Sequence, residues 1–210
     1  RLEHDRANGN PILAGLEEAP RIIHGVNRLD VTPTATFGAA PITLIPSYPD
    51  LPMEKVYPRV PHTDVAQVFM REVGAGRVVY FPWDVDRTFW EILDVDHGVL
   101  LRNAVAWATN EPAVVRVVGP GVLDVTAWRQ SHSATVHLVN LTNPMMMKGP
   151  LREVIPIGPQ HVSVRLPDGT RPKKVQLLTA GKDVDVKTTG QVVMLTVPSI
   201  DVHEVVAIDL

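Results

Sequence analysis

Residues 111–140 read EPAVVRVVGPGVLDVTAWRQSHSATVHLVN, a stretch in which apolar and polar side chains alternate between turn residues such as Gly119 and Gly121. Alternation with a period of two is typical of strands, because successive side chains point to opposite faces of a sheet. The pattern continues to the end of the chain in seven short runs: 114–118, 123–129, 135–140, 161–166, 174–178, 192–197 and 205–208. About seven strands in about 100 residues predict an antiparallel β-sandwich over residues 113–210.

The chain before this stretch follows other patterns. Residues 21–36 alternate around Gly25 and Asn27, which predicts short antiparallel strands. Seven prolines fall between Pro33 and Pro61. This density excludes a helix there and predicts loop and edge strand.

A helix, a strand and a second helix are expected next. Apolar residues at helical spacing predict a helix over 64–73, with Gly74 and Gly76 closing it. The β-branched and aromatic run at 77–81 predicts a buried strand. Residues 97–109 predict a helix capped by Asp96. A strand, a loop and a helix in this order are typical of the last βα unit of an α/β domain.

Composition limits the class of protein. The 210 residues are 45% hydrophobic and 20% charged, which is enough for a buried core. A net charge of -3 without a basic run argues against nucleic-acid and anionic-membrane partners. The absence of cysteine excludes disulfides, thiolate metal sites and cysteine nucleophiles. The chain has no apolar stretch long enough to span a membrane, so we expect a soluble protein.

The first residues leave the compartment open. The segment RLEHDRANGN is charged where a secretory signal carries an apolar run. The chain begins at Arg1 without an initiator methionine, so we expect a piece of a longer protein. Cytoplasmic and exported locations both fit these features.

The strongest candidate site directly follows the predicted strand at 77–81. It consists of Trp83, Asp84, Asp86, Arg87 and Trp90. Ligands of open α/β sheets gather beyond the carboxyl ends of strands. The two carboxylates could share a cation, bind a pair of sugar hydroxyls, or act as acid and base, and the tryptophans could stack on a sugar ring. Alternatively, one aspartate pairs with Arg87 or caps the turn, and the aromatic rings fill the core.

Other chemical motifs are missing from the sequence. It contains no HExxH, GxSxG, P-loop or dinucleotide fingerprint, so neither a metal nor another cofactor is expected. His137 and the pair His203 and Glu204 are predicted to lie on strand surfaces.

Six stretches carry a resemblance to a known family. They read NPILAGLEEAPRIIHG, PITLIPSYPDLPMEKVYPR, GAGRVVYFPWDVDRTFWEIL, HGVLLRNAVAWA, DVTAWRQSHSATVHLVNLTNPMMMKGP and PSIDVHEVVAIDL, and they lie along nearly the whole chain. The chain resembles the carboxyl-terminal region of bacterial glycoside-hydrolase-like proteins related to β-galactosidases with an amidotransferase-like trimerisation domain.

The resemblance implies a fold of two parts. Residues 1–112 look like an incomplete amidotransferase-like, flavodoxin-like α/β region, and residues 113–210 like the terminal β-sandwich. The (β/α)8 barrel that holds the catalytic carboxylates in such proteins has no counterpart here, so no catalytic residue is carried over. Active amidotransferases use a cysteine nucleophile, which this chain lacks.

Three functions remain open at this stage. The first is a non-catalytic accessory and oligomerisation region in carbohydrate metabolism, in contact with the catalytic barrel of the parent chain. The second is a carbohydrate-binding module using tryptophans, although Trp107 and Trp128 have regular helix and strand positions that predict burial. The third is a small hydrolase using Asp84 and Asp86, since residues i and i+2 of an extended chain share a face.

Self-association is expected through the first half of the chain. The related β-galactosidases trimerise through their amidotransferase-like domain, so the resemblance implies a homo-oligomer, with a trimer as the expected form. The segment PSYPDLPMEKVYPRVP at 46–61 carries apolar side chains without a periodic pattern that would bury them locally. Such loops are suited to interfaces. Alternatively, the loop folds over its own domain.

Overall fold

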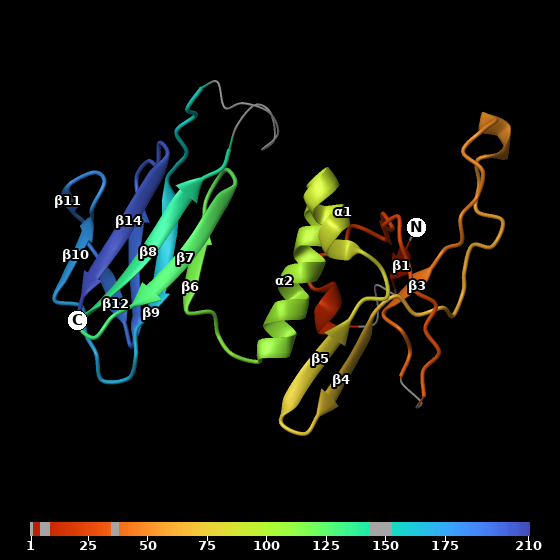
Figure 1. Ribbon diagram of the computed structural model, residues 1–210, viewed down its shortest axis with the longest axis horizontal. Coiled ribbons are helices and arrows are strands. Elements are labelled where there is room, and N and C mark those ends of the chain that lie inside the picture. The colour runs from red at the N-terminus through yellow and green to blue at the C-terminus, as the bar shows by residue number, and fades with distance from the viewer. Residues whose placement is uncertain (1, 5–8, 35–37, 143–152) are drawn as a thin grey trace. The chain divides into compact units, whose positions relative to one another are not determined.

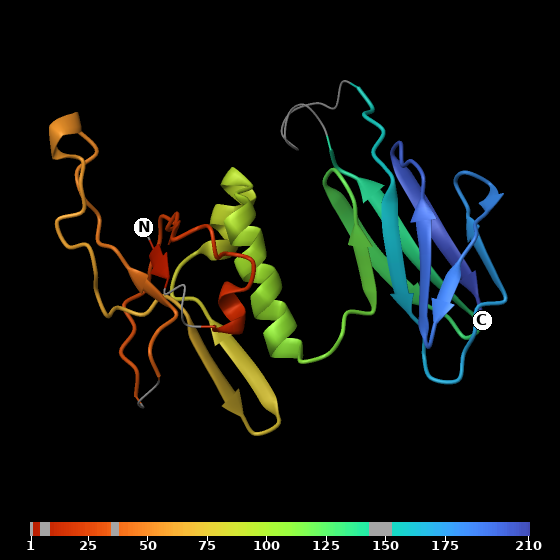
Figure 2. The same ribbon diagram turned by 180° about the vertical axis from the view of Figure 1, so that it is seen from behind.

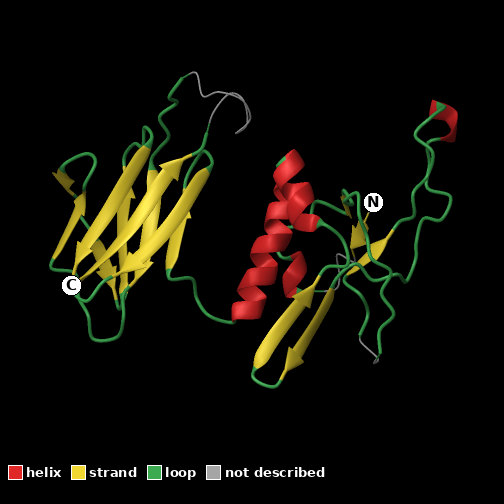
Figure 3. Ribbon diagram, in the orientation of Figure 1, coloured by secondary structure: helices red, strands yellow, loops and turns green. Residues whose placement is uncertain are grey.

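The computed structural model describes residues 2–4, 9–34, 38–142 and 153–210. The chain divides into two compact units, an N-terminal unit of Arg1–Pro112 and a C-terminal unit of Ala113–Leu210. Both α-helices belong to the first unit, whereas the second is built of strands (Figures 1 and 3).

The N-terminal unit combines two small antiparallel sheets with two helices. Strands β1 (Leu2–His4), β2 (Arg21–Ile22) and β3 (Ile42–Leu44) form a sheet in the order β2-β1-β3. Strands β4 (Phe69–Val73) and β5 (Gly76–Tyr80) form a separate hairpin. Helices α1 (Val85–Ile92) and α2 (Val95–Thr109) follow, and the 3-10 turns η1 (Pro11–Leu13) and η2 (Met53–Lys55) complete the unit.

The helix predicted over 64–73 is wrong, because the end of this segment is strand β4. Val73 pairs with Gly76, and Gly74 has a φ of +60° between them. The glycines that resemble a helix stop therefore form the turn of a β-hairpin, in which positive φ is required. Cross-strand pairing overrides a local helical spacing in this segment.

The burial expected for the strand at 77–81 is also corrected. Among the described strands, β5 pairs with β4 alone, and Val78 and Tyr80 on it are exposed. Every strand pair in the described ranges of the N-terminal unit is antiparallel. The unit thus lacks, in its described part, the parallel sheet on which a βα unit depends.

Helix α2 confirms the second predicted helix with a different start. Asp94, not Asp96, is the N-cap, and its side chain accepts a hydrogen bond from the backbone N–H of Asp96 at 3.0 Å. The helix contacts α1, η1 and β5. Its buried face carries Leu100 and Ala104 and completes a core whose other members come from η1, α1, the strands and the loops: Ile12, Leu13, Leu16, Ile22, Ile42, Val68, Trp83 and Val85.

The C-terminal unit consists of two antiparallel sheets (Figures 1 and 2). The five-stranded sheet has the order β11-β10-β14-β8-β7 and the four-stranded sheet the order β12-β13-β9-β6. The strands are β6 (Val115–Val118), β7 (Leu123–Arg129), β8 (Ser133–Asn140), β9 (Gln160–Arg165), β10 (Lys174–Leu177), β11 (Lys182–Asp183), β12 (Lys187–Thr189), β13 (Val192–Val197) and β14 (His203–Asp209). Each of the seven predicted runs overlaps one of these strands, which confirms their antiparallel β-structure.

One core joins the two sheets of this unit. Val136, Leu138 and Ile208 of the five-stranded sheet are buried in the same cluster as Val162 and Val193 of the four-stranded sheet. Burial alternates along β9, β13 and the middle of β8, as the sequence pattern predicts for a sandwich.

Glu204 differs from the prediction of a strand-surface residue, because only 3% of its surface is exposed. Its carboxylate accepts hydrogen bonds from the backbone N–H groups of Thr179, Ala180 and Val205 at 2.8–3.1 Å. A buried carboxylate needs such donors. The side chain therefore anchors the turn after β10 to strand β14.

Candidate functional site

Trp83 of the predicted site belongs to the core. It is 5% exposed, and its indole Nε1 donates a hydrogen bond to the backbone oxygen of Gln67 at 3.0 Å. One face of the ring is stacked on His24 with 5.2 Å between the ring centroids. The expectation that Trp83 offers a face to a sugar is therefore wrong, since protein groups already cover it.

Asp84 lies at the junction between this buried ring and α1. Its carboxylate accepts hydrogen bonds from the backbone N–H of Asn27 at 3.2 Å and from the side-chain Nδ2 of Asn27 at 2.9 Å. Burial raises the pKa of Asp84, but the hydrogen bonds from Asn27 and the nearby charge of Arg87 outweigh it and hold the pKa below the usual 3.8. Asp84 is thus a stable carboxylate with a structural partner.

The remaining predicted residues lie on α1 and face solvent. Asp86, Arg87 and Trp90 are exposed, and Arg87 pairs through Nε with Glu91 at 2.8 Å. The prediction that the carboxylates of Asp84 and Asp86 share one face is wrong. Helix α1 begins at Val85, and residues two apart on a helix do not face each other. The alternative prediction, an ion pair of Arg87 with Asp84 or Asp86, is also wrong, because Arg87 is paired with Glu91.

The structure adds residues that the sequence reasoning missed. His24 lies 2.6 Å through Nδ1 from the backbone oxygen of Gly25 and 3.3 Å through Nε2 from Oε1 of Gln67. Gln67 is fully buried and donates through Nε2 to the backbone oxygen of Ala66. The only sequence signal was the HGVN segment at 24–27, whose partners lie 43 and 57 residues further along the chain.

A hollow of about 570 Å³ opens beside these residues. Its polar lining comes from two loops: His24, Arg28, Ser47, Tyr48 and Asp50. Arg28 is ion-paired with Asp30. Hydroxyl, imidazole and carboxylate groups around one hollow can form hydrogen bonds with a polyol. The hollow is therefore a candidate for ligand binding in the N-terminal unit.

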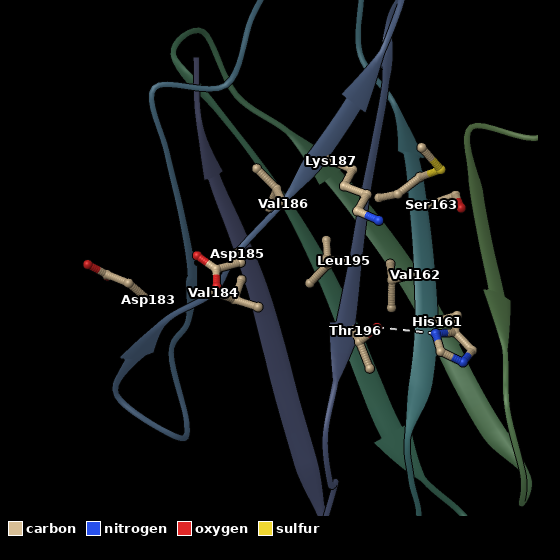
Figure 4. Close-up of a pocket in the computed structure, with 11 residues that line it drawn as sticks. His161, Val162, Ser163, Asp183, Val184, Asp185, Val186, Lys187, Leu195 and Thr196 are labelled. Atoms are coloured by element: carbon tan, nitrogen blue, oxygen red, sulfur yellow. Dashed lines mark hydrogen bonds between the residues drawn. The ribbon is translucent and has the colours of Figure 1, made fainter.

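Figure 4 shows a larger hollow, of about 940 Å³, over the four-stranded sheet. His161 Nδ1 lies 3.2 Å from Thr196 Oγ1, and Asp183 and Asp185 lie on the opposite side of the view. Hydrogen bonds from Gln176 and Lys174 lower the pKa of Asp183, although burial opposes this. Asp183 is thus bonded to Gln176 and Lys174, and the neighbour recorded for the His161 ring is the hydroxyl of Thr196.

Two histidines are stacked on the five-stranded sheet. The His137 and His203 rings are 5.3 Å apart at an angle of 12°, and Nδ1 of the first lies 3.2 Å from Nε2 of the second. Both are half-buried on the face away from the core. The described ranges hold no group of three or more histidine, aspartate or glutamate side chains suited to a metal ion.

Trp128 is 65% exposed, so its predicted burial is wrong. Trp128 lies on β7, the last strand of its sheet, and pairs with Thr135 of β8. The next residue of β8, Val136, points to the core, so Thr135 and Trp128 lie on the opposite face of the sheet. Trp107 is half-buried, with the Arg77 guanidinium 5.1 Å above its ring. Its replacement by alanine is therefore expected to cost less than the roughly 3–5 kcal/mol of a buried tryptophan.

Replacement of Asp84 by asparagine should remove a stabilising contribution that depends on pH. A carboxylate whose pKa is lower in the folded state stabilises the fold above its unfolded pKa and loses this effect as the pH falls through the folded value. Urea midpoints of the wild type and Asp84→Asn should therefore differ most above about pH 5, and the difference should shrink as the pH falls below 3.8. A difference between the two urea midpoints that grows as the pH falls would contradict the lowered pKa of Asp84.

Comparison with known proteins yields one described likeness. No protein-family model matches the chain, and no curated protein matches it. The solved structure of alpha-L-fucosidase isoenzyme 2 from Paenibacillus thiaminolyticus matches with a TM-score of 0.54 at 21% identity. The match covers 66% of this chain and 21% of the fucosidase, so the chain corresponds to about a fifth of that protein's length. At this identity the likeness concerns the fold alone.

No helix in the described part of the chain is both long enough and apolar enough to cross a membrane.

Proposed function

We propose that this chain is a non-catalytic accessory and oligomerisation region of a glycoside-hydrolase-like protein. The observation that carries the proposal is the match in fold to a fucosidase. The match covers only 21% of that enzyme, as expected for one region of a larger protein. The arrangement of Asp84 supports it, because Asn27 occupies the carboxylate that a hydrolase would need free.

Purified chain should release no nitrophenol from nitrophenyl α-L-fucoside or β-galactoside above the rate in buffer. Asp84 and Asp86 are not placed as an acid and base pair, and general acid–base catalysis requires both groups at the reacting bond. Asp84→Ala is the informative variant, with Asp168→Ala in the other unit as its control. Turnover that is lost only in Asp84→Ala would favour the small-hydrolase alternative and overturn the accessory role.

Self-association is the second part of this proposal. The loop at 46–61 exposes Leu51 by 75%, Met53 by 76% and Tyr57 by 53%. Apolar side chains grouped on an irregular loop favour burial against another surface, and a second and third copy of the chain are proposed to provide it.

Sedimentation velocity at tens of micromolar should therefore give a species larger than the 23.1 kDa monomer, with a trimer as the expected end point. Leu51→Asp combined with Met53→Asp should shift it to monomer, since both side chains are exposed in the single chain and their replacement leaves its core intact. Val26→Asp, at another highly exposed position, is the control. A monomeric wild type would contradict self-association.

Carbohydrate binding is the second candidate function, and the exposure of Trp128 favours it. A solvent-facing indole offers the flat apolar surface that a pyranose ring packs on. Of the tryptophans proposed for such a module, Trp90 and Trp128 are accessible, at 61% and 65% exposure, whereas Trp83 is buried.

A further inference from the structure

We propose that the outer face of the five-stranded sheet binds a neutral oligosaccharide that packs on Trp128. The proposal rests on the second candidate function, carbohydrate binding, and names its site and its class of ligand. The site, called here the Trp128 face, lies on three neighbouring strands, β7, β8 and β14 (Figure 1). It consists of Asp124, Thr126, Trp128, Thr135, His137 and His203.

Strand register places these side chains on one face of the sheet. Trp128 is paired with Thr135, and Thr126 is paired with His137. Directly paired residues of antiparallel strands point to the same face. Val136, which lies between Thr135 and His137, is buried in the core of the sandwich, so both pairs point away from that core.

Asp124 and His203 extend the same face. Asp124 lies two residues before Thr126 on β7, and residues two apart on a strand share a face. The ring of His203 lies beside that of His137, with Nε2 of the first 3.2 Å from Nδ1 of the second. The register agrees, because Asp124 and His203 are paired with Val139 of β8 from its two sides. The six side chains therefore form one continuous surface.

The indole of Trp128 is the apolar part of this surface. The side chain is 65% exposed, although tryptophan is on average highly buried in folded proteins. Its Nε1 has no hydrogen-bond partner within the described part of the chain. A pyranose can cover the ring with its C–H face while one of its oxygens accepts a hydrogen bond from Nε1.

The other side chains of the Trp128 face are suited to sugar hydroxyls. Asp124 and Thr126 are exposed, and neither side chain has an ion pair or hydrogen bond with another described residue. A carboxylate accepts hydrogen bonds from hydroxyls, and a threonine hydroxyl both donates and accepts. The contact between His137 and His203 fixes the positions of two half-buried imidazoles. Groups held in place before binding lose less side-chain freedom when a ligand arrives.

Charge and length define the class of ligand. The structure describes β7, β8 and β14 in full, and none of their outward positions carries lysine or arginine, whereas Asp124 and Asp209 are outward. An acidic sugar would meet like charges here without a cation to offset them, so a neutral sugar is favoured. Asp124 lies four residues from Trp128, or about 13 Å along the strand. A ligand that reaches both must contain several rings.

Isothermal titration of the whole chain with the neutral trisaccharides galactotriose and cellotriose and with the acidic trigalacturonate tests the proposal. We expect at least one neutral trisaccharide to bind at millimolar concentration. Trigalacturonate should bind at least about tenfold more weakly, because of the repulsion from Asp124. The monosaccharide of the bound sugar should also bind more weakly, because one ring on Trp128 does not reach the other end of the face.

Variants locate the ligand on the Trp128 face. Trp128→Ala should weaken binding at least about tenfold, and Trp128→Phe, which keeps an aromatic ring, should recover part of the affinity. His137→Ala and Asp124→Asn should each weaken binding about threefold or more, since each removes hydrogen-bonding groups. The matched controls are Trp90→Ala, at an equally exposed tryptophan on α1, and His161→Ala, at an exposed histidine of β9. Both should bind like the wild type.

The outcomes separate this proposal from the function on which it rests. Binding that survives in Trp128→Ala and in His137→Ala would overturn this face as the site and leave carbohydrate binding standing. Trigalacturonate that binds as tightly as the neutral sugars would overturn the class of ligand. Loss in Trp128→Ala alone would overturn the part assigned to His137 and Asp124. No binding of any of the three trisaccharides at millimolar concentration would overturn both the proposal and the second candidate function. Circular dichroism of each variant shows that the fold is retained.

Discussion

Replacement of Trp83 by alanine should lower the free energy of unfolding of the N-terminal unit by about 3–5 kcal/mol. The side chain is 5% exposed and belongs to a core that also contains Ile12, Ile22 and Leu100. Alanine would leave a cavity in this core and would also leave the backbone oxygen of Gln67 without its donor.

Aromatic contacts raise the expected cost. The Trp83 ring is stacked on His24 and meets His97 and Phe81 edge to face, with centroids 5.9 and 6.2 Å away. Such pairs add to the stabilisation from burial. Urea unfolding followed by circular dichroism measures the loss, and Trp90→Ala is the control, because that ring is 61% exposed and its removal should change the stability by less than about 0.5 kcal/mol. A loss below about 1 kcal/mol for Trp83→Ala would contradict its place in the core.

Replacement of Gly25 by alanine should destabilise the same unit by about 3 kcal/mol. A Cβ atom at this position would lie 1.8 Å from Oδ1 of Asp84 and 2.6 Å from Oγ1 of Thr88. Real Cβ atoms do not approach so closely, so the Asp84 carboxylate would have to move away from Asn27 and lose the hydrogen bonds that hold the two segments together.

Two further variants separate this clash from a general effect of alanine. Gly38→Ala adds the same methyl group where no atom lies within 4 Å, and it should leave the urea midpoint unchanged. Combining Gly25→Ala with Asp84→Ala removes the atom that the methyl group meets, so the double variant should be more stable than the sum of the two single losses predicts. Additive losses would place the cost of Gly25→Ala outside its contact with Asp84.

The C-terminal unit was largely predictable because its strands carry their pattern locally. Each of the seven alternating runs became a strand, and the valines and leucines of β9 and β13 face the core as their spacing indicates. Strands β11 and β12 were missed, since their residues KD and KTT contain no apolar side chain that could mark a buried face.

The N-terminal unit depended more on contacts between distant segments. Helix α2 was predictable from its apolar face, but the residues that became β4 carry a helical spacing and fold as a strand because β5 pairs with them. For the candidate site, the sequence pointed to Trp83 and Asp84 but not to their partners. Gln67, His24 and Asn27 reach them across 16 to 59 positions of the chain, by contacts that no local pattern records.

The two tryptophans Trp83 and Trp128 show what the sequence alone determined and what it did not. Alternation established that Trp128 lies on a strand and on the opposite face from Ala127 and Arg129. It could not establish which face the second sheet covers, or that β7 ends its sheet, because both depend on how the strands associate. In the same way, the sequence around Trp83 predicts an exposed loop, but His24 and Gln67 from distant segments contact the ring and bury it. Period and composition determine which residues share a face, whereas burial is decided by what packs against that face in the tertiary structure.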